Sequence, residues 1–472
     1  MSASGSPPRS ESIDWDAFAA RLDGIELIRE PVLVRKRSRD FFWYSPLLNE
    51  RLRKSFGDIV AVPSDRGELV RCLAAAYACD VPVTLRGGGT GNYGQAVPLE
   101  GGLIIETTAM NRIIEIGAGR VRAEAGALMA DINAALADSG QELAIFPSTQ
   151  DMATLGGFVA GGSGGIGSLA HGMLRDPGNL VSLNALSVEA EPQERRFDGP
   201  DALQIHHAWG LNGVITDVTV RTVPRQDWVG CIASFDGYSA AYGAGHAIAA
   251  NKGLGCKLVS TVDARIAAYF PRLAGHVRER ADLVVAMVPR GGLDVLRGLI
   301  AEHGGTLDIA MSEHERAAKG LPHVFEFSYN HTTLQVLKAD RSATYQQIAV
   351  PDPANVDAIV RLGAALGDDV WQHHEFARLN GKLAAFDLPI IWFSTRERLE
   401  AINATYEAHG FSVFDAHTFH VEGGGLKSAD YRHLAWKKRM DPKGLLNRGK
   451  SLAWPEVRHL SPEEIEALAN RT

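Results

Sequence analysis

The chain has 472 residues, of which 45% are hydrophobic and 22% charged, and its formal net charge is −8. This is the composition of a soluble globular protein, and the length exceeds what one hydrophobic core supports, so we expect two domains. The acidic balance, without large Lys/Arg clusters, argues against a nucleic-acid partner. No apolar run approaches the roughly 18 residues of a membrane span, and the polar residues 1–12 predict a disordered tail without a signal peptide.

Cysteine usage indicates the compartment. Cys72, Cys79, Cys231 and Cys256 have neither metal-ligand nor iron–sulfur spacing. We expect Cys72 and Cys79 to be buried as small hydrophobic side chains on one face of a helix. The pattern fits a reducing environment, so we predict a cytoplasmic protein.

The first half of the chain reads as a mixed α+β unit. Residues 58–63 predict a strand that ends at a proline, and Asp65 then caps a helix that runs to Cys79. A further strand begins at Val81. The remaining predicted elements are strands at 103–107, 112–116, 120–125 and 218–223 and a helix at 127–139.

A glycine-rich loop follows the strand at residue 81. Residues 86–94 read Arg-Gly-Gly-Gly-Thr-Gly-Asn-Tyr-Gly. Without Cβ atoms, successive backbone N–H groups can turn inward and bind anionic oxygens, typically those of a pyrophosphate. No lysine follows as in a P-loop, and Pro98 with Gly101 and Gly102 argues against the helix of a Rossmann motif. The sequence predicts a strand–loop–strand phosphate cradle.

A second small-residue segment occupies residues 154–167. A flexible linker is the plain alternative for such a composition. Leu155, Phe158, Val159 and Ile166 recur at packing intervals, which favours a second cradle, where a planar ligand or another backbone lies against the chain.

With both loops, the chain resembles flavoproteins of the vanillyl-alcohol oxidase / p-cresol methylhydroxylase superfamily, in the branch of D-lactate dehydrogenases and the glycolate oxidase flavin subunit. The resemblance covers roughly residues 45–225 and 430–455. Its motifs are the segments 82–92, 147–167, 171–172, 213–216 and 441–450, where Arg448 replaces the usual proline. It implies a two-part p-cresol-methylhydroxylase-type FAD-binding domain with an inserted α+β cap domain.

The resemblance implies FAD as cofactor. Thr90 stands where covalent members often carry a histidine, so we expect non-covalent FAD, and we expect bulky residues at Gly88 or Gly157 to abolish flavin binding with the fold retained. The implied FAD-binding residues are Arg86, Gly87, Gly88, Gly89, Thr90, Gly91, Asn92, Tyr93, Gly94, Gln95, Pro147, Ser148, Thr154, Gly156, Gly157, Gly161, Ser163, Gly164, Gly167, His171, Gly172, Ile215 and Asn447.

The middle of the chain predicts a cap built on an antiparallel sheet. Strand-like runs at 229–234, 283–288, 324–328 and 345–350 alternate with helical patterns at 238–251, 292–303 and 354–365, and the chain turns helical after Lys427. We predict a tail with a lead-in helix at 1–40, the FAD-binding domain at 41–225, the cap at 226–428, and a segment at 429–472 that returns to the FAD domain.

Histidines of the second half are the candidates for a catalytic base. A predicted strand over 417–422 places His420 and Glu422 on one face, as a base with its orienting carboxylate or as two metal ligands, and His417 on the other face. Metal-dependent relatives carry a histidine beside the glutamate where this chain has Gly423. We therefore expect no metal and activity that survives EDTA.

The rival site ends the predicted strand at 324–327. Tyr329 and His331 would meet a substrate there, although a turn that caps the next helix explains the pattern equally well. Arg378 and His417 are candidates to bind the substrate. Arg378, by a bidentate contact, and Lys382 could hold a substrate carboxylate, with solvent exposure or ion pairing as the alternative for each.

Together these features predict an FAD-dependent oxidoreductase. It would oxidise a small hydroxylated substrate, a 2-hydroxy acid or an alcohol, by hydride transfer to flavin N5 with a histidine base. An oxygen-using alcohol or phenol oxidase and the flavin subunit of an electron-transfer complex remain as alternatives. The electron acceptor is oxygen, a quinone or a partner protein, and a homodimer is left open.

Overall fold

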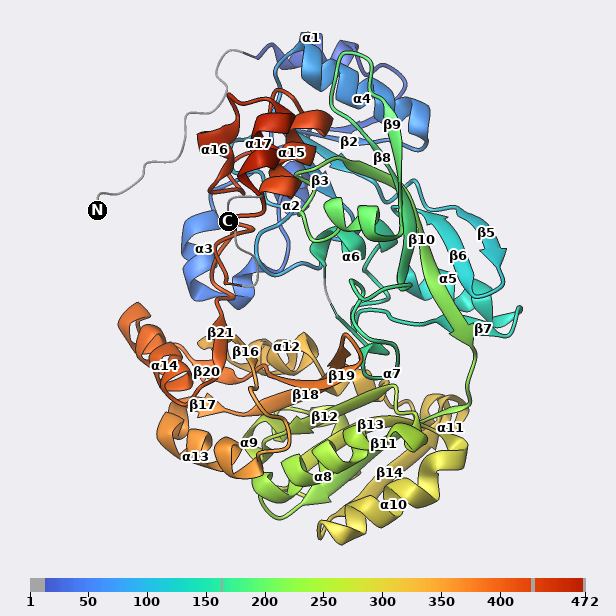
Figure 1. Cartoon of the computed structure of the whole chain (residues 1–472), viewed down its shortest axis with the longest axis vertical. Helices are drawn as coiled ribbons and strands as arrows, with labels where there is room; N and C mark the ends of the chain where they lie inside the picture. The colour runs from blue at the N-terminus through green and yellow to red at the C-terminus, as the bar shows by residue number, and fades with distance from the viewer. Residues whose placement is uncertain (1–12, 163, 426–428, 470–472) are drawn as a thin grey trace.

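A computed structural model describes residues 13–162, 164–425 and 429–469; the predicted tail at 1–12, Ser163 and Lys427 lie outside the described residues. Figure 1 shows two lobes. The terminal lobe holds elements from both ends of the chain, residues 13–224 and 429–469, and the middle lobe holds residues 228–414. β10 ends at Pro224 and β11 begins at Trp228. The domain division predicted from the sequence is kept here as a proposal.

The first sheet of the terminal lobe carries the glycine-rich loop. Its strands, in order, are β1 (Glu26–Ile28), β2 (Ile59–Val62), β4 (Leu103–Glu106) and β3 (Val83–Arg86). β3 pairs parallel with β4, so the loop between them is the predicted strand–loop–strand connection. Asp65 accepts a hydrogen bond from the Glu68 N–H at 2.9 Å and caps α4 (Arg66–Ala78). This confirms the predicted cap.

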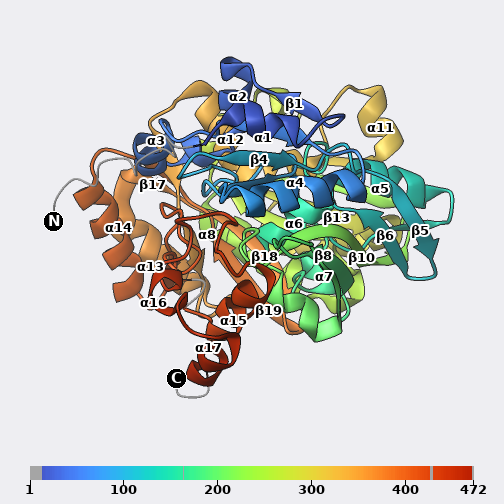
Figure 2. The same ribbon diagram turned by 90° about the horizontal axis from the view of Figure 1, so that it is seen from above.

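The C-terminal segment returns to this sheet. The Val83 N–H donates to the Leu445 carbonyl and the Asn447 N–H donates to the Val83 carbonyl, at 2.9 and 2.7 Å. The helices around this segment are α15 (Tyr431–Met440), α16 (Trp454–Val457) and α17 (Pro462–Leu468). Figure 2 shows α15 and α17 on the opposite side of the molecule from α1 and α2. Lys443, which follows α15, pairs with Asp80 at 2.7 Å and so joins this segment to the residues that follow α4.

The second sheet of the terminal lobe is antiparallel. Its strands, in order, are β5 (Ile113–Gly117), β6 (Arg120–Glu124), β10 (Val214–Pro224), β8 (Leu180–Leu186) and β9 (Glu194–Asp198), with β7 (Gln141–Leu143) also paired to β10. The helices that follow β6 and β7 are α5 (Met129–Ala137), α6 (Leu155–Gly161) and α7 (Ser168–His171).

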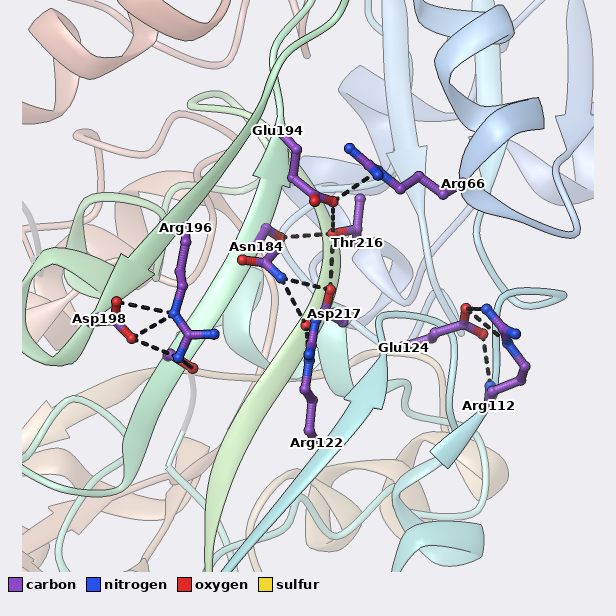
Figure 3. A network of polar contacts seen from close by, with 11 residues as sticks. Arg66, Arg112, Arg122, Glu124, Asn184, Glu194, Arg196, Asp198, Thr216 and Asp217 are labelled. Atoms are coloured by element: carbon purple, nitrogen blue, oxygen red, sulfur yellow. Dashed lines mark hydrogen bonds and ion pairs between the residues drawn. The ribbon is translucent and has the colours of Figure 1, made fainter. Parts of the chain in front are cut away.

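Polar contacts tie this sheet together (Figure 3). Asp217 of β10 pairs with Arg122 of β6 at 2.7 Å and accepts the Asn184 side-chain amide of β8 at 3.0 Å. Glu194 of β9 continues the chain of contacts to Arg66 of α4 at 3.0 Å. These contacts fix β10, whose first residues border the cavity described below.

The middle lobe confirms the predicted antiparallel sheet. Its large sheet runs β14 (Thr306–Ser312), β11 (Trp228–Phe235), β13 (Asp282–Pro289), β12 (Leu258–Val262), β18 (His373–Leu379), β19 (Lys382–Asp387), β16 (Gln347–Ala349) and β21 (Ser412–Phe414), with antiparallel pairing throughout. A smaller sheet contains β15 (Ala343–Tyr345), β20 (Ile390–Trp392) and β17 (Val370–Trp371).

The predicted middle-lobe helices match α8 (Tyr238–Ala250), α10 (Leu293–Glu302) and α13 (Val356–Leu366). The remaining α-helices are α1 (Trp15–Ala20), α2 (Pro31–Arg37), α3 (Pro46–Leu52), α9 (Ala264–Ala267), α11 (Glu313–Ala318), α12 (Asn330–Ala339) and α14 (Arg396–Ala408). Within the described residues, none of the helices is long and apolar enough to cross a membrane.

Two strand predictions are wrong. Residues 324–327 form the 3₁₀ helix η6 (Val324–Phe327), because Val324, Phe325 and Phe327 are all buried in the core, and that spacing does not fit the alternation of a strand. Residues 417–422 form turns and bends between β21 and α15. The run at 345–350 is divided, since β15 and β16 belong to different sheets.

Candidate active site

One cavity of about 580 Å³ is lined by residues of both lobes. Its terminal-lobe wall contains most of the residues predicted to hold the cofactor, namely Arg86, Gly87, Gly88, Gly89, Thr90, Gly91, Asn92, Tyr93, Gln95, Pro147, Ser148, Thr154, Gly156, Gly157, Gly161, Gly164 and Ile215. We call this the glycine wall. The volume of the cavity and the backbone-rich lining of this wall are typical of a small-molecule site.

The two glycine loops are interlocked. A Cβ on Gly88 would lie 1.8 Å from the Met152 carbonyl oxygen, and one on Gly87 would lie 2.1 Å from the Thr154 Oγ1. Thr154 caps α6 by accepting the Gly157 N–H at 3.2 Å, so residues 155–161 are a helix and not a linker. A side chain at position 88 therefore collides with backbone, and the expectation that the fold survives there is not supported.

Gly157 differs from Gly88. It is exposed to the cavity, and an added Cβ would meet only the Thr154 Oγ1, at 2.9 Å. A larger residue at 157 would occupy ligand space without displacing the backbone of the other loop.

Five predicted cofactor residues do not line the cavity: Gly94, Gly167, His171, Gly172 and Asn447. Two of them have a clear structural role. Asn447 adopts a positive φ of 44° and donates its side-chain amide to the Gln95 and Trp209 carbonyls, at 2.9 and 2.6 Å. Gly167, at φ +100°, passes the Ala144 carbonyl so closely that a Cβ would lie 2.0 Å from it. Asn447 thus positions the glycine wall indirectly, through Gln95 and Trp209.

Sequence reasoning missed several lining residues, among them Trp209 and Arg175. The Trp209 ring stacks on Tyr93 with centroids 6.0 Å apart, and within the described residues its buried Nε1–H has no hydrogen-bond acceptor. An orphaned indole donor in a cavity wall indicates a place for a ligand acceptor. Trp209 belongs to none of the glycine motifs, so nothing in the sequence marked it.

The opposite wall, from the middle lobe, consists of Tyr329, Asn330, His331, Gln347, Ala349, Glu375, Ala377, Leu379, Phe386, Leu388 and Phe414. We call it the cap wall. Tyr329 precedes α12 with φ 49° and ψ −146°, a conformation that costs energy for a residue with a Cβ. Its N–H donates to Glu375 Oε1 at 2.5 Å and its hydroxyl to the Gly165 carbonyl at 2.8 Å. Tyr329 thus joins the two walls.

The predicted alternative at residues 328–333 was a side-chain cap on the following helix. In the described residues α12 begins without such a cap. The buried Asn330 Oδ1 also lacks a partner there and belongs to the cap wall.

His331 is paired with a carboxylate. Its Nδ1 lies 3.1 Å from Glu326 Oε2, and its side chain is 8% exposed. No described residue pairs with Nε2. A histidine with a carboxylate on one ring nitrogen and a cavity beside it has the arrangement of a general base.

His420 and Glu422 do not line this cavity. Glu422 accepts hydrogen bonds from the Ser451 hydroxyl and from the Leu452 N–H at 2.9 Å. Burial, with Arg51 and Lys450 nearby, lowers the pKa of His420. Because 417–422 is not a strand, the geometric reason for pairing these two residues is lost.

The two substrate-binding candidates also lie elsewhere. His417 Nδ1 is 2.7 Å from the Ser45 hydroxyl, and burial lowers its pKa. Arg378 donates to the Ala249 carbonyl of α8 at 3.3 Å. Its neighbours Ala377 and Leu379 line the cavity, so Arg378 is on the opposite face of β18.

A buried polar network supports the cap wall from behind. Glu375 accepts the Ser260 hydroxyl at 2.6 Å and lies 2.8 Å from His373 Nε2. The His373 N–H donates to Asp387 Oδ1 at 3.1 Å, and the Tyr406 hydroxyl donates to Oδ2 at 2.8 Å. Burial raises the pKa of Asp387 to about 7.

Arg86 begins the glycine loop but is held by protein groups. It donates to the Arg37 and Arg39 carbonyls, at 3.0 and 2.5 Å, and lies 3.6 Å from Glu106. Among the described residues, no group of three or more His, Cys, Asp or Glu side chains is placed to hold a metal ion.

Comparison with known proteins finds relatives for the segment that contains most of the glycine wall. A family model described as an FAD binding domain matches residues 57–188. An uncharacterised FAD-linked oxidoreductase of Mycobacterium tuberculosis, Rv2280, is 32% identical over 35% of this chain and 38% of its own length. Glycolate oxidase subunit GlcD of Escherichia coli is 30% identical over 38% of this chain and 37% of its own length. The matches therefore span well under half of either relative.

Two solved structures superpose on nearly the whole chain. An alkyldihydroxyacetonephosphate synthase superposes with a TM-score of 0.68 at 15% identity, covering 95% of this chain and 86% of that one. The 4-ethylphenol oxidase of Gulosibacter chungangensis gives 0.66 at 16% identity, with coverage of 95% and 99%. At these identities the likeness concerns the fold.

The residues present fit FAD. The glycine wall supplies inward backbone and the orphaned Trp209 donor, and Gly157 leaves open space where a side chain would project. The chain thus carries an FAD-binding domain and shares its fold with these solved enzymes.

Proposed function

We propose that the protein is an FAD-dependent oxidoreductase that oxidises a small substrate at a carbon bearing a hydroxyl group. One observation carries this proposal: the glycine wall and His331, whose Nδ1 lies 3.1 Å from Glu326 Oε2, border the same cavity. The related glycolate oxidase subunit, named for a hydroxy-acid reaction, supports the same class of donor.

The two walls would divide the reaction. Bound FAD would accept the hydride from the substrate carbon. His331 takes the hydroxyl proton on Nε2, and the carbonyl product forms as the C–H and O–H bonds break. Glu326 Oε2 lies 3.1 Å from Nδ1, without a directed hydrogen bond, and stabilises the charge that His331 gains. Tyr329, bonded to the Gly165 carbonyl, keeps the cap wall against the glycine wall.

The identity of the electron acceptor separates three versions of this function. An oxygen-using oxidase consumes oxygen steadily with turnover. A dehydrogenase, or a flavin subunit of an electron-transfer complex, turns over only with a quinone, a dye or a partner protein. The proposal also includes a cytoplasmic location and a homodimeric state.

The test begins with the purified protein. We expect it to be yellow and to release FAD into the supernatant on acid precipitation, because Thr90 offers no histidine for a covalent link. Anaerobic addition of hydroxylated compounds should then bleach the flavin absorbance. A colourless protein that cannot be reconstituted with FAD would overturn the proposal, whereas flavin in the pellet would overturn only the non-covalent part.

A further inference from the structure

The helix that carries His331 begins at a strained peptide. Tyr329 directly precedes α12 and adopts φ 49° and ψ −146°, a combination that is unfavourable for a residue with a Cβ. His331 follows two residues later and lines the cavity, so the conformation of Tyr329 decides where the His331 ring enters the cap wall. A strained conformation of this kind persists only when the surrounding structure imposes it. The contacts around Tyr329 must therefore hold it.

Both backbone polar groups of Tyr329 are bound by buried side chains. The N–H donates to Glu375 Oε1 of β18 at 2.5 Å, and the carbonyl accepts the Thr332 hydroxyl at 2.7 Å. Glu375 and Thr332 are 1% and 0% exposed, so removal of either side chain leaves a backbone group of Tyr329 without its partner in a buried place. The two contacts fix the peptide planes on both sides of Tyr329.

His373 connects these two side chains. Since the Thr332 hydroxyl gives its one hydrogen to the Tyr329 carbonyl, its oxygen acts as the acceptor toward His373 Nδ1, 3.0 Å away. The Leu388 carbonyl, 3.3 Å from the same nitrogen, also requires a donor there. His373 Nε2 lies 2.8 Å from Glu375 Oε1, without a directed hydrogen bond. Glu375, Thr332 and His373 thus form a closed set of contacts around Tyr329, which we call the Tyr329 clamp.

The Tyr329 clamp is anchored in the large sheet of the middle lobe. His373 and Glu375 are two residues apart on β18 and share one face of that strand. Glu375 Oε2 accepts the Ser260 hydroxyl of β12 at 2.6 Å, which holds the carboxylate from the neighbouring strand. Glu375 lines the cavity, whereas Thr332 and His373 do not. Thr332 and His373 can therefore act on the reaction only through the residues that they hold.

We propose that Glu375, Thr332 and His373 are positioning residues, which hold the strained Tyr329 peptide and so direct His331 into the cavity. The proposal rests on the proposed role of His331 as the base and adds the residues that place it. In a purely structural role, the Tyr329 clamp would only satisfy buried polar groups of the core, and His331 would keep its position without it.

A matched pair of variants separates these two roles. Thr332→Val removes the hydroxyl of the clamp and keeps the branched shape of the side chain. Thr261→Val is the control, because Thr261 is also 0% exposed, does not line the cavity and lies 3.0 Å from the Tyr238 hydroxyl. Crystal structures of both variants with FAD bound measure the Tyr329 φ and the distance from His331 Nδ1 to Glu326 Oε2. We expect Thr332→Val to relax Tyr329 to a negative φ and to move the His331 ring, and Thr261→Val to change neither.

Anaerobic stopped-flow reduction of the flavin gives the second readout. The donors are glycolate, which carries a carboxylate, and 1-phenylethanol, which is neutral. A misplaced base slows the chemical step, so we expect Thr332→Val to lower the limiting reduction rate about 10²-fold. FAD content and the donor concentration for half-maximal rate should not change, because Thr332 does not line the cavity. Thr261→Val should be reduced at the unmodified rate.

The carboxylate of the clamp allows a rescue experiment. Glu375→Gln keeps an oxygen that can accept the Tyr329 N–H, whereas Glu375→Ala leaves this N–H unpaired. We expect Glu375→Gln to retain the Tyr329 conformation and nearly the unmodified reduction rate. Glu375→Ala should reproduce both the structural change and the slow reduction of Thr332→Val.

Three results would overturn the proposal: an unchanged Tyr329 φ and His331 position in both Thr332→Val and Glu375→Ala, a displaced His331 ring with an unmodified reduction rate, or equal slowing in Thr261→Val. If the His331 ring moves as expected while neither donor reduces the flavin of the unmodified protein, the positioning of His331 by the Tyr329 clamp stands. The proposed oxidation then fails for these donors.

Discussion

The two walls of the cavity are built in different ways. The glycine wall is made of short contiguous segments whose backbones approach one another closely. A Cβ on Gly88, for example, would collide with the Met152 carbonyl oxygen. The cap wall collects alternate side chains from strands that are far apart in the sequence, such as Phe386 and Phe414. The first construction suits a cofactor-binding site, and the second can change one side chain at a time, which supports the proposal that the cap wall contacts the substrate.

The largest expected effect comes from adding side chains at two glycines of the glycine wall, Gly88 and Gly157. Gly88→Val should yield protein that neither binds FAD nor folds stably, because its Cβ would overlap the Met152 carbonyl oxygen. Gly157→Val should lose FAD while keeping its fold, since an added side chain there projects into the cavity. FAD content and thermal unfolding measure both. Normal FAD content in both variants would remove these loops from the cofactor site.

A second prediction concerns the network behind the cap wall. Burial raises the pKa of Asp387 from about 4 in an unfolded chain to about 7. The folded state therefore binds this proton more tightly than the unfolded chain does. The free energy of unfolding falls by on the order of 4 kcal/mol as pH rises from 4 to 7, because the buried carboxyl must then ionise. Asp387→Asn should remove this loss. Its free energy of unfolding, compared with that of the unmodified protein, should therefore be higher at pH 8 than at pH 5.

Urea unfolding of Asp387→Asn and the unmodified protein at both pH values checks this. Asp357→Asn, at an exposed position of α13, is the matched control and should show no such pH dependence. Parallel pH profiles for Asp387→Asn and the unmodified protein would show that this carboxyl ionises in the fold as it does in water.

A third, smaller effect tests the contact between the walls. Tyr329→Phe removes the hydrogen bond to the Gly165 carbonyl and should cost about 1 kcal/mol of stability, with weaker FAD retention. Tyr242→Phe removes a similar bond to the Pro353 carbonyl inside the middle lobe. It should cost as much stability without affecting FAD. Equal FAD retention in the two variants would mean that Tyr329 does not hold the walls together.

The smallest expected effect is that of metal removal. EDTA should leave activity largely intact, because Gly423 stands where metal-dependent relatives carry a histidine. Activity that is lost with EDTA and restored by zinc or manganese would show that His417, His420 or Glu422 recruits a metal.

The same contrast explains what the sequence could predict. The glycine loops, the Asp65 cap and the return of Asn447 to the first sheet are local signals, because residue type and backbone geometry are linked within a few positions. The antiparallel cap sheet was also predictable, from the spacing of apolar runs. These features needed no knowledge of which strands pair.

The cap wall needed that knowledge. Glu375 lines the cavity from β18, where it is paired with Phe386 of β19, and no local motif marked it as a lining residue. The prediction of a base at His420 assumed a strand over 417–422, where the chain instead turns back toward Ser451 and Leu452. Long-range pairing decided both cases.

The proposed proton acceptor of the reaction is His331, on the cap wall. Anaerobic stopped-flow reduction of the flavin in His331→Ala, with His420→Ala as the control, tests it most directly. We expect His331→Ala to retain FAD and to be reduced about 10²–10⁴-fold more slowly, and His420→Ala to be reduced at nearly the unmodified rate. Normal reduction in His331→Ala together with slow reduction in His420→Ala would contradict it and return the base to the turn at residues 417–422.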